Sequence, residues 1–164
     1  MRRVTRRRRV LTTAVAAGLL AVGYLGTTAL RFRYATGRHV TDRESLEEAW
    51  ALFNPFRARE PERMANDLLA ALVRGECQQA LVALAFSESD QRYLCANEEA
   101  IPMHRFTLIG RKDTASGASF VFRTYLSLAG NPRQFQAYAS VQAERRDGNW
   151  SVTKYFRVRD PLSR

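Results

Sequence analysis

Residue types that carry out chemistry are few in this chain, and their spacing matches no reaction or metal site. The chain has two cysteines, Cys77 and Cys95, and two histidines, His39 and His104. The spacing of these four residues fits no zinc-binding pattern. The sequence also has no glycine-rich phosphate loop, HExxH motif or Ser-His-Asp signature. We therefore expect no metal, no cofactor and no enzymatic activity.

His104 is the residue best placed to act as a base, because it opens an expected strand and can point toward the covering helices. A strand-end or surface histidine is the simpler interpretation, and an enzyme with His104 as base is kept as an alternative. Glu98 and Glu99 follow an expected helix and are interpreted as a solvated pair. The other side chains able to exchange a proton are Asp113, Tyr125, Tyr138 and Tyr155.

The two cysteines are 18 residues apart and fall on neighbouring expected helices. A domain exported to an oxidising compartment usually pairs its thiols. We therefore predict a disulfide between Cys77 and Cys95, which would stabilise the fold by about 3 kcal/mol in the chain-entropy treatment. The alternative is two free, buried thiols that act as small apolar side chains.

The positive charge of the chain is confined to its start. The net charge is +10, from 26 basic and 16 acidic residues. Residues 1–40 hold nine arginines and no acidic residue, which leaves 17 basic and 16 acidic residues in 41–164. A nucleic-acid-binding domain carries its basic patch on the folded body. The nearly neutral body therefore argues against nucleic acid as a partner.

Residues 10–30 form an uncharged apolar stretch of the length that crosses a bilayer. Three arginines follow the stretch, at positions 31, 33 and 38. Six arginines precede it, namely Arg2, Arg3, Arg6, Arg7, Arg8 and Arg9. The positive-inside rule then predicts an anchor in the bacterial inner membrane, with tail 1–9 in the cytoplasm and the domain in the periplasm or outside.

Two other kinds of segment share these features. A cleavable signal peptide also has a basic start, and Thr27-Thr28-Ala29 is a passable cleavage site, but the apolar stretch is long for that class. A twin-arginine export signal fits Arg8-Arg9 loosely. An amphipathic surface helix is excluded because the stretch has no polar face. An uncleaved anchor is the interpretation that we adopt.

Small side chains recur along the anchor at helical spacing. Ala14 and Gly18 are four residues apart, as are Ala17 and Ala21. This spacing allows close approach of another membrane helix, although alanine and glycine are common in any membrane helix. We therefore predict other membrane-protein subunits as partners.

The rest of the chain is expected to contain helices first and strands afterwards. A polar connector over 31–41 leads to a helix up to residue 53, capped by Thr41 or Asp42. Further helices are expected at 60–73, opened by Pro61 and closed by Gly75, at 76–85, and from Ser87 to about 95. From residue 102 the apolar period changes from 3.6 to 2.

Four strands are expected at about 103–111, 118–128, 134–145 and 149–158, separated by Gly, Asn and Pro turns. Short connections imply an antiparallel meander with one apolar face that the helices cover. The fold class is therefore α+β. Arg123 and Tyr125 share the other face, where they are placed to bind an anion or to form ordinary surface.

The order of elements, the segment Arg146 to Tyr155 ("RDGNWSVTKY") and the helix–Gly–helix segment at 69–82 resemble the nuclear-transport-factor-2-like superfamily. The resemblance covers residues 42–160 and implies a cone-shaped extracytoplasmic domain, with 161–164 as a tail. Anchored bacterial members of such folds include lipoprotein-like domains and one-span subunits of secretion systems. Enzymes of the superfamily work inside the cup between sheet and helices.

These observations predict a single-span accessory or structural subunit that presents its domain to a larger secretion, respiratory, photosynthetic or envelope complex. A sensor or small-ligand module that holds an apolar ligand in the cone cavity is the second hypothesis. The third is the enzyme that uses His104.

Overall fold

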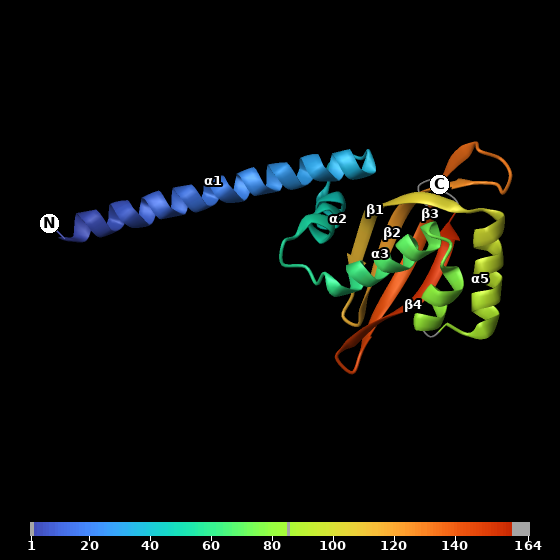
Figure 1. Ribbon diagram of the computed structural model, residues 1–164. Helices are drawn as coiled ribbons and strands as arrows, with labels where there is room; N and C mark the ends of the chain where they lie inside the picture. The colour runs from blue at the N-terminus through green and yellow to red at the C-terminus, as the bar shows by residue number, and fades with distance from the viewer. Residues whose placement is uncertain (1, 85, 159–164) are drawn as a thin grey trace. The chain divides into compact units, whose positions relative to one another are not determined.

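The computed structural model describes residues 2–84 and 86–158, with side chains for 13–82, 84 and 86–157. The protein belongs to the α+β class and divides into two compact units, Met1–Phe53 and Asn54–Arg164 (Figure 1). The first unit consists of two helices. The second combines three helices with an antiparallel sheet, and the order of helices before strands is the one that the periodicity predicted.

The first unit begins with the long helix α1, Arg2–Thr36. The connector expected over 31–41 is wrong for residues 31–36, because α1 continues through these residues to Thr36. Arginine is a good helix former, and no glycine or proline interrupts the chain between Leu30 and Gly37. Gly37 has a φ of 76°, which ends the helix. The Thr36 hydroxyl donates to the Phe32 carbonyl, which closes the last turn.

Helix α2, Arg43–Phe53, follows after a short loop. Asp42 caps it, as expected, because its carboxylate accepts from the Ser45 backbone N–H at 2.8 Å. This backbone hydrogen bond, together with one from the Ser45 hydroxyl, lowers the pKa of Asp42. Helix α2 groups with α1, so the boundary expected at residue 42 separates two helices that pack together.

The second unit contains α3, Glu60–Val73, α4, Cys77–Ala83, and α5, Glu88–Ala100. Pro61 stands in the first turn of α3, where its missing N–H costs nothing. Gly75, with a φ of 76°, separates α3 from α4. The Ser87 hydroxyl accepts from the Asp90 N–H and caps α5. Helix α5 runs about one turn further than the apolar pattern indicated.

The sheet is a meander with the order β1-β2-β3-β4 and antiparallel pairing throughout. Its strands are β1, Met103–Asp113, β2, Gly117–Ser127, β3, Gln134–Arg146, and β4, Asn149–Val158. All four match the expected strands within two residues. Asp147 and Gly148 both have positive φ, so the last hairpin turns through the two-residue loop that Asp-Gly favours.

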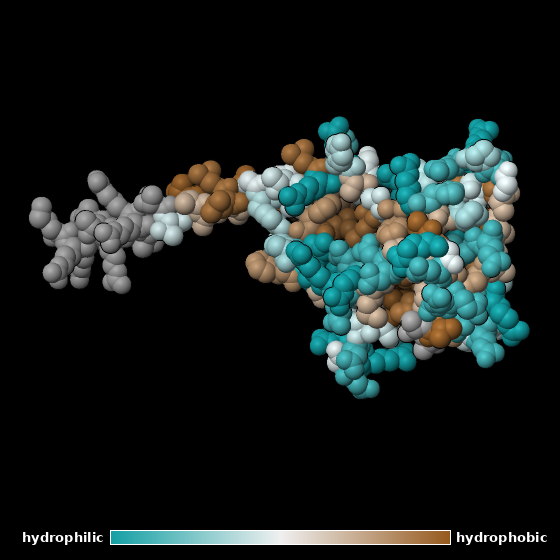
Figure 2. All heavy atoms as spheres, in the orientation of Figure 1, coloured by the Kyte–Doolittle hydropathy of each residue, from teal (hydrophilic) through white to brown (hydrophobic). Residues whose placement is uncertain are grey.

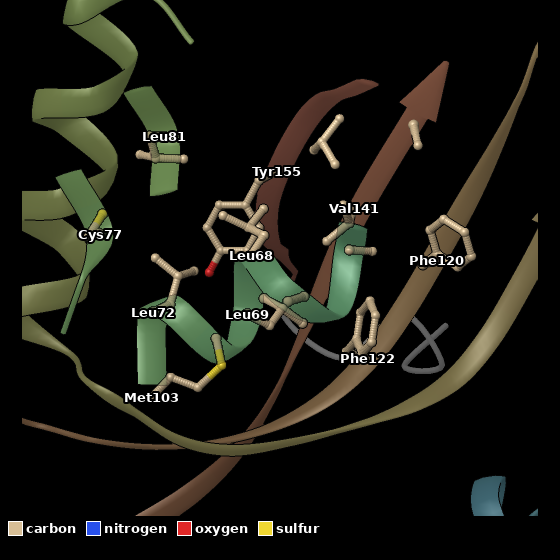
Figure 3. Packing of buried hydrophobic residues seen from close by; sticks show 14 of the residues in the cluster. Leu68, Leu69, Leu72, Cys77, Leu81, Met103, Phe120, Phe122, Val141 and Tyr155 are labelled. Carbon is tan, nitrogen blue, oxygen red and sulfur yellow. The ribbon is translucent and has the colours of Figure 1, made fainter. Parts of the chain in front are cut away.

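The core lies between one face of the sheet and the three helices. Helix α3 contacts all four strands. Leu68, Leu69 and Leu72 of α3 share one buried cluster with Phe120, Phe122 and Val141 of the sheet, and Figure 3 shows these residues. Phe120, Phe122, Leu69 and Leu81 have no exposed surface, so no space for a water molecule adjoins them.

Candidate functional site

Most of the exposed apolar surface of the first unit lies on helix α1. The segment Thr13–Thr36 is the one helix in the described residues that is long and apolar enough to cross a membrane. Val15, Leu19, Leu20 and Val22 are each more than half exposed. Figure 2 shows this surface as brown side chains along the helix. A signal sequence near the N-terminus can pass the same test of length and composition.

The small residues predicted to contact another membrane helix lie on the uncovered part of α1. Ala14, Ala17, Gly18 and Ala21 are all exposed, and apart from adjacent residues and nearby backbone of α1 no described atom lies within 4 Å of where a Gly18 side chain would begin. The surface that a second helix would use is therefore free in the described chain. The six arginine side chains at positions 2–9 lie outside the described side chains.

The C-terminal part of α1 is covered by α2. Thr28 and Phe32 are almost fully buried on α1, as are Ser45, Ala49 and Leu52 on α2. The Tyr24 hydroxyl donates to the Phe53 carbonyl at 2.7 Å. The rings of Tyr24 and Trp50 meet edge to face, with centroids 5.8 Å apart. These contacts fix the end of α2 at the level of Tyr24.

The two cysteines meet in the second unit. Their sulfur atoms lie 2.06 Å apart and their Cα atoms 5.6 Å apart, which is the arrangement of a disulfide between α4 and α5. Both side chains are buried in the hydrophobic cluster. The link ties α5 to the rest of the helical layer.

Glu98 departs from its expected role as a solvated residue. Its carboxylate is buried between α5 and β4, where it accepts from the Tyr155 hydroxyl at 2.7 Å and pairs with Arg157. A buried carboxylate requires such partners. Glu99 is exposed, as expected. The local sequence could not indicate that Glu98 is buried, because both of its partners lie more than 50 residues downstream.

The Glu98–Tyr155 contact makes the domain sensitive to alkaline pH. Burial, and then the adjacent Glu98 carboxylate, raise the pKa of Tyr155 well above its ordinary value of about 10. The unfolded chain therefore loses this proton at lower pH than the folded chain. The contribution to stability is complete below pH 10 and falls above it, by up to about 1.4 kcal/mol per pH unit.

We therefore expect the urea midpoint of the full chain in detergent to fall steeply above pH 10. In Tyr155→Phe the fall should be shallower, because this buried phenol is gone. Tyr93→Phe is the matched control, since Tyr93 is largely exposed on α5. Equal slopes in wild type and Tyr155→Phe would contradict the assignment.

A second buried ion cluster joins the start of α3 to the end of β1. Arg111 is almost fully buried and donates to the Ala58 carbonyl, to Glu62 and to Asp113. Arg57 also donates to Glu62, at 2.7 Å. Burial alone would raise the pKa of Glu62, but the hydrogen bonds and charges of Arg57 and Arg111 outweigh it and hold the pKa low. The cluster positions the loop before α3.

The sheet face opposite the core carries arginine and tyrosine side chains. Arg105, Tyr125 and Gln136 occupy one register row of β1, β2 and β3. The Arg105 guanidinium lies 3.7 Å from the centre of the Tyr125 ring. Gln136 donates to the Tyr138 hydroxyl at 2.8 Å. Arg123, paired with Tyr138 in register, lies on the same face. We call these residues the arginine–tyrosine face.

The remaining candidate residues form no catalytic arrangement in the described part of the chain. His104 is exposed at the start of β1, and its Nε2 lies 2.7 Å from the Ser127 hydroxyl. No carboxylate among the described residues is hydrogen-bonded to the other ring nitrogen. Ser127 itself is buried. Asp113 belongs to the Arg111 cluster. No group of three metal-ligating side chains occurs among the described residues.

Comparisons with known proteins add little to this description. No protein-family model matches the chain, and no curated protein matches it by sequence. A solved structure with similarity is that of a SEC-C motif-containing protein from Rhodopseudomonas palustris. The two chains are 17% identical, with a TM-score of 0.48 over 66% of this chain and 87% of the other. Similarity at this level supports no argument about function.

Proposed function

We propose that the protein is a single-span accessory subunit of the bacterial inner membrane, whose domain outside the cytoplasm docks onto a larger membrane complex. The observation that carries the proposal is the uncovered apolar surface of α1 directly behind a block of six arginines. Water is a poor solvent for such a surface, whereas lipid or another membrane helix covers it at no cost.

The domain offers a surface suited to a protein partner. Tyrosine and arginine are the side chains most enriched at the energetic centres of interfaces. Outside the hydrophobic cluster, the arginine–tyrosine face presents exposed Arg105 of β1 and half-buried Arg123 and Tyr125 of β2, whereas Tyr138 of β3 is buried. Because residues 41–164 are nearly neutral, docking on this face would rest on specific contacts rather than on overall charge. We further propose that the domain has the cone-shaped fold, which the helices on one sheet face support.

The orientation of the chain is directly measurable. Six arginines precede the apolar stretch and three follow it, so residues 40–164 are expected outside the cytoplasm. Protease added to intact spheroplasts should degrade the domain and leave a short protected fragment. Full protection of the domain would contradict this orientation. A mature chain that begins near residue 29 would instead identify the segment as a cleaved signal peptide.

The docking proposal is tested by affinity purification of the tagged full chain from solubilised membranes. Gly18→Leu blocks close helix approach but keeps membrane insertion, because leucine is favourable in the bilayer. Tyr125→Ala removes the centre of the arginine–tyrosine face. We expect both variants to remain in the membrane fraction and to lose the copurifying subunits. Tyr93→Ala, which alters an exposed tyrosine of α5, is the matched control and should copurify normally.

The combination of results separates the two surfaces. Loss in Gly18→Leu alone would assign the contact to the membrane helix, and loss in Tyr125→Ala alone would assign it to the domain. A wild-type chain that purifies from membranes without any other subunit would contradict the accessory role. In that case the alternative function, a sensor or small-ligand module, would be favoured. A small molecule retained in native mass spectra would support that alternative.

A further inference from the structure

Helix α2 carries two different flanks beside the face that packs on α1. At 100° per residue, Leu46 and Trp50 lie on one flank, and both are about 40% exposed. The opposite flank carries Glu44, Glu47 and Glu48. Part of the Trp50 ring touches Tyr24 of α1, but about 40% of Leu46 and of Trp50 is left uncovered by the described chain.

The level of Trp50 along α1 is fixed by direct contacts. Its ring touches the Tyr24 ring, and the Tyr24 hydroxyl holds the last carbonyl of α2. Tyr24 stands six residues before the end of the apolar stretch at residue 30. At 1.5 Å per residue this places Trp50 about 9 Å inside that end of the stretch. Whatever surrounds α1 at this depth also surrounds Trp50.

We propose that α2 is an interfacial helix whose Leu46–Trp50 flank is inserted among the acyl chains below the lipid headgroups. The membrane-embedded element is then the α1–α2 hairpin rather than α1 alone. This inference rests on the proposed anchoring of α1 in a bilayer.

Three observations favour lipid as the occupant of this flank. Leu25 and Leu30 on α1 are also exposed, so the apolar surface of the anchor continues beside α2. Tryptophan and tyrosine are the side chains that gather at the membrane interface. The carboxylates of α2 are partly neutralised, because Arg38 pairs with Glu48 at 2.9 Å and Arg43 with Glu47 at 2.9 Å. This pairing lowers the cost of holding α2 beside the headgroups.

Tryptophan fluorescence tests the proposal, because the chain has only two tryptophans. In full-length Trp150→Phe, Trp50 is the one emitter. The protein is reconstituted into phosphatidylcholine–phosphatidylglycerol vesicles that carry bromine either just below the headgroup or near the bilayer centre. We expect blue-shifted emission, strong quenching by the shallow bromine, weaker quenching by the deep bromine, and little quenching by iodide in the water.

Two variants in the Trp50→Phe, Trp150→Phe background serve as controls. Glu47→Trp places the emitter on the acidic flank of α2, and Tyr93→Trp places it on exposed α5. Both should be quenched by iodide more than Trp50 and by brominated lipid less. Trp50 emission that iodide quenches as strongly as Tyr93→Trp would overturn the proposal. Emission that neither quencher reaches would also overturn it, and would indicate a protein cover such as a second copy.

Vesicle flotation distinguishes failure of this inference from failure of the anchor. A chain that floats with the vesicles while Trp50 remains in water would overturn the interfacial helix alone. A chain that does not float would overturn both the anchor and the interfacial helix.

Discussion

Arg111→Ala is expected to lower the free energy of unfolding of the second unit by about 3 kcal/mol or more, the usual effect of removing one partner from a buried ion pair. The Arg111 side chain is 1% exposed and donates to Ala58, Glu62 and Asp113. Its guanidinium also lies 5.4 Å from the centre of the Phe120 ring. The alanine variant would leave the Ala58 carbonyl without this donor and a gap beside the core.

The measurement is urea unfolding of the full chain in detergent, followed by the fluorescence of Trp150 in a Trp50→Phe background. Trp150 packs against the core cluster, so its emission reports on the second unit. Arg146→Ala is the matched control, because Arg146 also pairs with a glutamate but its side chain is 73% exposed. We expect no measurable change in the control. Similar midpoints for Arg111→Ala and wild type would show that the buried cluster adds nothing to stability.

Removal of the Cys77–Cys95 link is expected to cost about 3 kcal/mol, because the unfolded chain regains the freedom of an 18-residue loop. The effect should be seen in Cys77→Ala/Cys95→Ala, in which the replacements keep the sites apolar. Wild type treated with a reducing agent should lose a similar amount, which separates the crosslink from the loss of sulfur packing. The same urea assay measures both.

The oxidation state is checked independently by mass analysis of unreduced protein. The chain should be two hydrogens lighter than after reduction. Complete alkylation of both thiols in denatured, unreduced protein would contradict the prediction and would point to the alternative of two free, buried thiols.

The sequence predicted the local structure well, because the signals are local. Proline, glycine and serine at helix ends, the change of apolar period and the Asp-Gly hairpin each act over a few residues. They located every helix and strand of the second unit within about one turn. The pairing of the cysteines could be predicted equally well, since two cysteines allow one pairing.

The buried ionic contacts could not be predicted in the same way. Glu98 looks like its neighbour Glu99 in the sequence, and only the approach of β4 buries one and not the other. Arg111 lies between glycine and lysine near the end of β1, a position typical of surface. The packing of α2 on α1 was missed for a related reason. The resemblance places residues 42–53 in the extracytoplasmic domain, whereas Ala49 and Leu52 are buried within the first unit.

The meander order of the sheet has a consequence for how the domain matures. Each strand pairs with the strand made just before it, so a chain that emerges N-terminus first forms its hairpins in order of appearance. Glu98 cannot form its contacts early, because its partners Tyr155 and Arg157 belong to the last strand. Until then this carboxylate on α5 resists burial. Burial of Glu98 is therefore completed only when β4 pairs. We expect chains that end before β4 to keep this part of the domain open and sensitive to proteases.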